Sequence, residues 1–158
     1  MSSPQAVKEA QALLRLRVMR EDAAQVSLQR CREQQAECQR THDRRVAQIA
    51  SLRSARLELL DWQSNRGAIA APRTWPYAGA RLAALDDELE RAEVELVDER
   101  NDLQRADHEL ETARQAWLHE RARRQAVEQL GHDARRSLAR LRELRVEREI
   151  EPRLLLGI

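Results

Sequence analysis

Two cysteines and a histidine are the residues whose types and spacing come closest to a chemical site. Cys31 and Cys38 are seven residues apart and His42 follows four residues later, so a helix would place all three on one face. Thiolate and imidazole are ligands for soft metal ions, which makes a metal site conceivable. The same spacing also continues a hydrophobic heptad, in which small cysteines pack as alanine does. We prefer this structural interpretation, because metal-binding cysteines usually lie closer together and are joined by a second pair.

The other polar residues form no recognisable catalytic or cofactor site. His108, His119 and His132 are isolated, and no nucleophile or carboxylate stands at a catalytic spacing from them. The sequence has no glycine-rich phosphate loop, no HExxH motif and no nucleophile elbow. The acidic residues of 82–111 are interpreted as solvated helix faces, because a slender helical protein offers no water-excluding pocket. We therefore expect no enzymatic activity, no cofactor and no bound metal.

The composition argues against a compact globular core. Charged residues make up 35% of the 158 positions, and the aromatic residues are three Trp and one Tyr. The apolar residues are mostly Leu, Ala and Val, so any core must be a thin seam, as in long helices or coiled coils. No apolar run approaches the ~18 residues of a membrane span, and the start lacks the features of a secretory signal. We expect a cytoplasmic protein that does not insert into a membrane.

Proline and glycine divide the chain into two helical arms. Neither residue occurs in the first arm, and Gly131 alone interrupts the second, where it would mark a hinge, a frayed boundary or a tight crossing. Pro152 should end the second arm, because proline cannot continue a helix. The predicted elements are a first helix (5–66), a tip loop (67–79), a second helix (80–151) and an apolar tail (152–158).

Both arms carry a repeat of 3.5 residues, which favours a coiled coil. In the second arm leucine fills one heptad position from Leu82 to Leu110, and the repeat continues through Trp117 to Leu141. The first arm keeps the same step from Ala10 onward, with more polar interruptions. A sustained repeat of this length specifies a left-handed coiled coil. The predicted fold is therefore all-α, with two long helices forming an antiparallel coiled-coil hairpin from a single chain, and we expect a monomer.

Charged residues interrupt the seam in both arms. If the arms fold back antiparallel, positions whose numbers add to about 141–148 lie at similar heights. Glu21 then lies near Arg124, and Arg45 lies near Glu99. Opposite charges would meet at both interruptions, which supports an intramolecular hairpin in this register.

Charge is distributed unevenly along the chain. Residues 1–20 and 135–158 each carry a net charge of +3, whereas 82–111 holds twelve acids against three arginines. A hairpin would therefore be basic at its open end and acidic nearer its tip. Two interpretations remain open: uneven patches on highly charged helices, or two ends that bind different partners.

The aromatic residues of the tip also have two interpretations. Trp75 and Tyr77 flank Pro76, and large aromatics at a hairpin tip can anchor an interface. Alternatively, they fold back over Ile69 and cap the open end of the seam. We prefer the capping interpretation slightly, and both can hold together.

The arginine-rich end of the second arm raises the question of nucleic-acid binding. Its glutamates interleave with the arginines at helical spacing, which predicts local ion pairs. They are Glu143, Glu147, Glu149 and Glu151. No aromatic stacking platform accompanies the arginines, so we do not expect nucleic-acid binding.

The layout of the whole chain resembles the FliJ/YscO/HrpO family, the stalk proteins of flagellar and type III secretion export machines. The closest likeness is the segment 84–100, ALDDELERAEVELVDER, together with 13–20, LLRLRVMR. The family shares the length, the Arg/Glu/Gln-rich helical arms and the single Pro/Gly tip. The apolar tail 154–158 has no clear place in the family pattern.

The resemblance implies a non-enzymatic connector at the cytoplasmic face of the inner-membrane secretion apparatus, a machinery of virulence in many bacteria. The paired basic ends would enter the pore of a hexameric ATPase and stimulate it, and secretion chaperones would be further partners. The tip, with Trp75 and Tyr77, would face the membrane export gate. The arginines that the resemblance assigns to the ATPase are Arg15, Arg17, Arg20, Arg136, Arg140, Arg142, Arg145 and Arg148.

Two other functions remain as alternatives. A generic coiled-coil scaffold or chaperone-like protein would use the same seam to dimerise. An RNA-binding arm ranks third, and a steep dependence of RNA retention on salt would be its signature.

Overall fold

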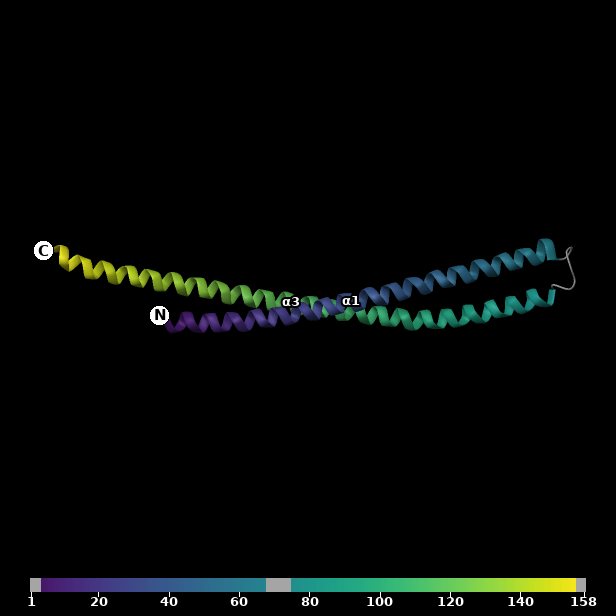
Figure 1. The fold of residues 1–158 in the computed structure, drawn as a ribbon, viewed down its shortest axis with the longest axis horizontal. Helices are drawn as coiled ribbons and strands as arrows, with labels where there is room; N and C mark the ends of the chain where they lie inside the picture. The colour runs from purple at the N-terminus through teal and green to yellow at the C-terminus, as the bar shows by residue number, and fades with distance from the viewer. Residues whose placement is uncertain (1–3, 68–74, 156–158) are drawn as a thin grey trace. The chain divides into compact units, whose positions relative to one another are not determined.

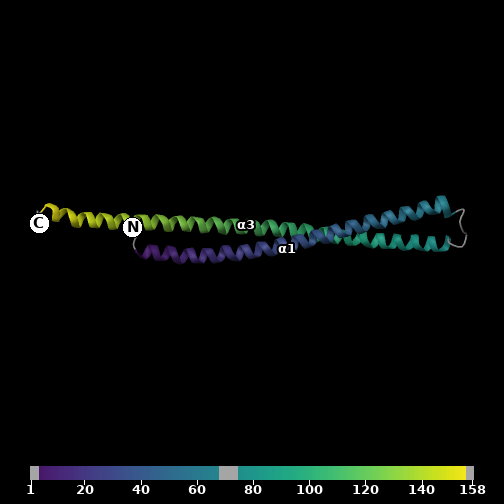
Figure 2. The same cartoon turned by 45° about the horizontal axis from the view of Figure 1, so that its top comes forward.

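The chain folds into two long helices that pack against each other. The computed structural model describes residues 4–67 and 75–155, and all of them are helical. Helix α1 spans Pro4–Trp62, the π-helical turn η1 spans Gln63–Gly67, and helix α3 spans Trp75–Leu155. Helices α1 and α3 run side by side (Figures 1 and 2). The predicted all-α helical hairpin is thereby confirmed.

The hairpin comprises two packing units, which we describe separately. The terminal unit combines Met1–Gln29 with Thr112–Ile158, and the loop unit comprises Arg30–Glu111. In the loop unit, residues further along α1 pair with earlier residues of α3, as in Arg45 with Glu99 and Arg56 with Asp86. The two helices of this unit are therefore antiparallel.

The buried side chains that α3 contributes to the loop unit lie seven or fourteen residues apart. They are Ala78, Leu85, Ala92 and Ala106, and α1 contributes the buried Ile49. Three of the four α3 positions are alanine, whose small side chain lets two helices approach closely. Among the described residues of the loop unit, Leu85 and Ala92 are each 2% exposed, and Leu85 is the largest side chain that is fully buried.

The terminal unit buries fewer side chains between its two helices. Leu28, Ala113 and Val127 are buried, and every predicted seam position before Leu141 is buried or half-buried. The prediction for Leu141 is wrong, because its side chain is 47% exposed. Helix α1 begins at Pro4 and offers no residue to cover α3 at this level.

Both ends of α3 lie outside the predicted range of 80–151. The helix begins at Trp75 because Pro76 falls in the first turn, where a missing N–H leaves no intrahelical bond unmade. It continues through Pro152 to Leu155, so part of the predicted tail is helical. Pro152 removes one backbone donor close to the end of the helix, where little helix remains to be disrupted.

Gly131 neither breaks α3 nor marks a tight crossing. The helix runs through it, and a Cβ built on Gly131 meets no heavy atom within 4 Å. It instead lines a hollow between the helices with Val7, Leu14 and Val127.

We expect Gly131→Ala to raise the free energy of unfolding by about 0.5–1 kcal/mol, because alanine restricts the unfolded chain and fits the helix. Urea unfolding followed by circular dichroism checks this result. Gly79→Ala makes the same change in the loop unit and serves as the comparison, since a Cβ built on Gly79 also meets nothing within 4 Å. A destabilised Gly131→Ala variant would mean that the helices close over this position.

Candidate interaction surfaces

The cysteine and histidine positions belong to the seam of α1. Cys31, Cys38 and His42 are half-buried, and both cysteines are free thiols. His42 Nδ1 lies 3.3 Å from Asp43 Oδ1. Within residues 4–67 and 75–155, no three His, Cys, Asp or Glu side chains gather closely enough to hold a metal ion. Half-burial of all three side chains is consistent with packing at seam positions.

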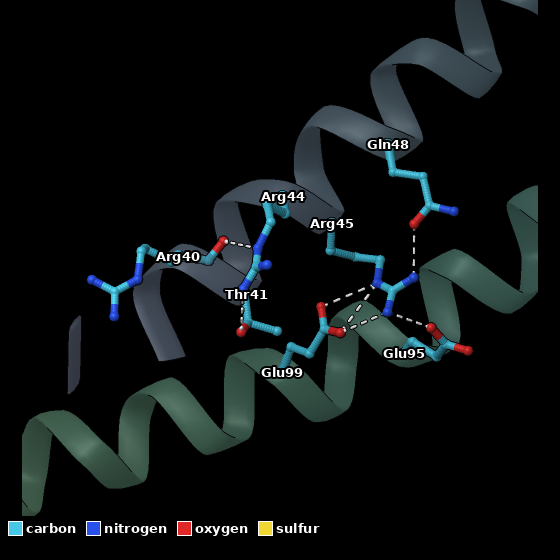
Figure 3. Close-up of polar contacts among 7 residues, drawn as sticks. All are labelled: Arg40, Thr41, Arg44, Arg45, Gln48, Glu95 and Glu99. Carbon is cyan, nitrogen blue, oxygen red and sulfur yellow. Dashed lines mark hydrogen bonds and ion pairs between the residues drawn. The ribbon is translucent and has the colours of Figure 1, made fainter. Parts of the chain in front are cut away.

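Arg45 and Glu99 meet across the loop unit, as their positions in the heptad predicted. Arg45 Nε donates hydrogen bonds to both carboxylate oxygens of Glu99, at 3.1 and 3.2 Å, and its Nη2 donates a third at 2.9 Å. The same guanidinium contacts Glu95 at 2.5 Å and donates to Gln48 at 2.7 Å (Figure 3). The hydrogen bonds to Glu99 raise the pKa of Arg45 above its ordinary value. Arg45 thus stays charged and fixes the register of the two helices.

Further ion pairs neutralise part of the acidic segment of α3. Arg53 contacts Glu93 at 2.9 Å, and Arg56 contacts Asp86 at 2.6 Å. Other acids of this segment are exposed and form no ion pair within the described structure. They are Asp87, Glu90, Asp98 and Glu109. The loop unit therefore keeps an acidic outer surface on α3.

The outward face of α1 in the loop unit is an ionic network. Glu37 accepts hydrogen bonds from Arg40 at 2.6 Å and from Arg44 at 3.3 Å. Arg44 also donates to the carbonyl oxygen of Arg40 (Figure 3). The hydrogen bond from Arg40 and its charge lower the pKa of Glu37 below its ordinary value. Charged side chains that pair with one another in this way suit a helix face that is exposed to water.

The terminal unit contains a second pair that the sequence predicted. Arg124 Nε donates to Glu21, and its Nη1 donates to Glu128 at 2.9 Å. The side chains of Glu21 and Arg124 are 15% and 25% exposed. The opposite charges therefore meet at the predicted seam interruption.

Sequence reasoning missed a neighbouring pair, Arg17 and Glu120. Arg17 Nη1 lies 3.8 Å from Glu120 Oε2, and both side chains are 20% exposed. Sequence analysis placed both residues on the seam. The antiparallel register that it inferred did not set them opposite each other. Of the arginines that the resemblance assigns to an ATPase, Arg17 thus faces α3 and is not free to reach a partner.

Trp117 lies on the seam of the terminal unit, where it is half-buried as the repeat predicted. The Arg121 guanidinium lies 5.2 Å from the ring centroid, within range of a cation–π contact. Its indole N–H is buried and makes no hydrogen bond to the residues that the structure describes. Trp117 therefore contributes its ring to packing inside the hairpin.

At the arginine-rich end of α3, the local ion pairs that the sequence predicted do not form within the described structure. Every side chain of residues 139–151 is exposed, and no ion pair within the described structure involves an arginine of this end. Exposed pairs gain little free energy against the loss of side-chain freedom, which explains why the expected pairs with Glu143, Glu147, Glu149 and Glu151 do not form. The free arginines are Arg135, Arg136, Arg140, Arg142, Arg145 and Arg148.

At the start of α3, Tyr77 does not fold back over the seam. Its side chain is 78% exposed, and the buried residue at this level is Ala78. Capping by Tyr77 is therefore wrong, because a side chain on this face of the helix points away from α1. The side chain of Trp75 and the whole of Ile69 lie outside the described residues.

Two further findings bear on function. None of the described helices has a stretch apolar and long enough to cross a bilayer. Comparison of the chain with family models, with curated proteins and with solved structures finds no match.

Proposed function

We propose that this protein is a non-enzymatic stalk of a type III secretion export apparatus. It binds a hexameric ATPase through its basic ends, stimulates that ATPase, and connects it to the export gate through the start of α3. It acts at the cytoplasmic face of the inner membrane, as one chain in each ring, and contacts secretion chaperones. The resemblance to the FliJ/YscO/HrpO family motivates this proposal.

The observation that supports it best is the uncovered end of α3. Val7 and Leu14 of α1 face Val127 and Gly131 of α3, so α3 continues past the start of α1 (Figures 1 and 2). Every side chain of the overhang, residues 139–151, is exposed, yet the segment is helical. A helix without tertiary packing is marginal in water, so an overhang of this kind calls for a partner.

The chemistry of the overhang fits insertion into a protein pore. Four arginines without ion pairs, Arg140, Arg142, Arg145 and Arg148, offer bidentate contacts to carboxylates. Exposed apolar side chains stand between them and can fill pockets of the same partner. They are Leu141, Leu144, Val146 and Ile150. A protein surface with acidic and apolar patches matches this mixture better than a nucleic acid would.

The start of α3 supplies the second contact of the proposal. Tyr77 is an exposed aromatic in the first turn, and aromatic side chains often anchor interfaces. It belongs to the loop unit, whose α3 carries the unpaired acids. The two units therefore present surfaces of different chemistry, as a connector requires.

A pull-down with a precise truncation tests the proposal. The full chain is compared with a chain that ends at Leu138, which keeps every half-buried seam position and removes the overhang. We expect the full chain to recover a hexamer-forming ATPase from the native cytoplasm, and the truncated chain to lose it. Circular dichroism must show equal helicity per residue in both chains. If the full chain recovers neither an ATPase nor an export-gate component at low salt, the stalk proposal falls and the scaffold alternative takes its place.

A further inference from the structure

The outward face of α1 in the terminal unit carries a second apolar stripe. Its members are Ala12, Leu16, Met19, Ala23 and Val26, which are separated by alternating steps of four and three residues. Each of them follows a seam position by two residues, and two residues turn an α-helix by about 200°. The stripe therefore lies on the side of α1 opposite to α3. All five side chains are exposed, Met19 by 69% and Val26 by 53%.

The stripe is confined to this part of α1. The same step continues into the loop unit through Arg30, Glu33, Glu37, Arg40 and Arg44, most of them in the ionic network described above, and then reaches Ala47, Ser51 and Ser54. A solvated face needs no apolar heptad, and contiguous exposed apolar residues mark interaction sites. The change from charged to apolar residues on one face of one helix indicates that the terminal unit packs against another helix.

We propose that the partner is a second copy of this chain, bound antiparallel through this stripe. A twofold axis at Met19 would place Ala12 opposite Val26 of the second copy, and Leu16 opposite Ala23. Leu16 and Val26 then each face an alanine, which is the arrangement that fills a helix interface, and Met19 faces its own copy on the axis. Parallel pairing would instead set alanine against alanine and leave gaps.

The charges beside the stripe favour the same orientation. Arg15 and Asp22 are seven residues apart on one edge of the stripe, and that edge faces itself in an antiparallel pair. Arg15 of each copy would meet Asp22 of the other, which gives two ion pairs. In a parallel pair, Arg15 would meet Arg20, which carries the same charge.

The dimer should be weak and reversible. The stripe covers only two heptads, whereas stable coiled coils usually sustain three or four. The two copies of Arg20 would also approach each other near the axis. The sequence analysis predicted a monomer, because it assigned only one apolar seam to each helix and that seam lies within the hairpin. The dimer does not depend on the proposed stalk function, but it would cover Arg15 and Arg20 and so compete with the ATPase for them.

Sedimentation equilibrium of the full chain across a wide concentration range tests this proposal. We expect a monomer at low concentration and a dimer at high concentration. Met19→Glu should weaken the dimer by at least about tenfold, because two carboxylates would then meet on the axis without partners. Leu57→Glu is the matched control, since Leu57 is 65% exposed in the loop unit and outside the stripe; this variant should dimerise as the parent does.

Charge reversal and cross-linking test the orientation. Arg15→Asp and Asp22→Arg should each weaken the dimer, and the double variant should restore it. In a background with Cys31→Ala and Cys38→Ala, a mixture of Ala12→Cys and Val26→Cys chains should form disulfides between unlike chains. Predominant disulfides between like chains would overturn the antiparallel arrangement. A chain that stays monomeric at all concentrations, or a Met19→Glu variant that dimerises unchanged, would overturn the proposal.

Discussion

Replacing Leu85 by alanine should lower the free energy of unfolding by about 2–5 kcal/mol, the range found for leucine removal from protein cores. Leu85 is only 2% exposed, and its neighbours along the same heptad position are the alanines Ala78 and Ala92. These small side chains cannot extend to refill the space that the leucine leaves. In a seam only one layer thick, the loss of one large side chain removes a large share of the local packing.

Leu57→Ala provides the matched comparison, because it makes the same chemical change in the same unit. Leu57 is 65% exposed, so this variant should change the free energy of unfolding by less than about 0.5 kcal/mol. Urea unfolding followed by circular dichroism measures both variants under one condition. Equal destabilisation of the two would mean that the seam does not run through Leu85.

The seam was predictable because its information is local and repeated. A step of 3.5 residues fixes which side of a helix each residue occupies, so Leu85 and Ile49 could be assigned to the interface without knowledge of the partner. The pairing of Arg45 with Glu99 followed from the antiparallel return of the chain and from the position of the breakers. These contacts depend only on the heptad assignment and on the antiparallel register, and several residues constrained each of the two.

The remaining differences arise where end effects and solvent decide the structure. The start of α3 at Trp75 depends on the tolerance of a first turn for Pro76, which a rule about helix-breaking residues misses. The unpaired state of Arg145 depends on a small balance between charge attraction and side-chain entropy. The pairing of Arg17 with Glu120 depends on how long side chains reach along the seam. None of these balances is visible in a heptad pattern.

The outward stripe shows a different limit of sequence reasoning. Leu16 and Met19 were visible in the sequence, but one apolar seam was sufficient to explain a hairpin. The half-burial of Leu14 and Arg17 shows which face of α1 meets α3 in the terminal unit. The stripe becomes informative once the other face has a known partner.

Reversing three arginines of the overhang should abolish stimulation of the ATPase. The variant combines Arg140→Glu, Arg142→Glu and Arg145→Glu, all at exposed positions without ion pairs in the described structure. Acidic contacts on the ATPase would then face like charges, and such contacts cost several kcal/mol. ATP hydrolysis by the purified hexamer, measured with increasing amounts of the variant, should stay at its basal rate. The parent chain should raise that rate until its sites are saturated.

A second triple variant separates loss of contact from a change in net charge. Arg30→Glu, Arg32→Glu and Arg114→Glu reverse three exposed arginines that also lack ion pairs in the described structure, but lie outside the overhang. This control changes the net charge equally, so it should stimulate the ATPase as the parent does. None of the six positions belongs to the outward stripe, so dimerisation should be unaffected in both variants. Full stimulation by the overhang variant, with unchanged helicity, would remove these arginines from the contact; equal loss in both variants would reduce the effect to net charge. Loss in the overhang variant alone would assign the contact to the end of α3, where helix continues without any covering from α1.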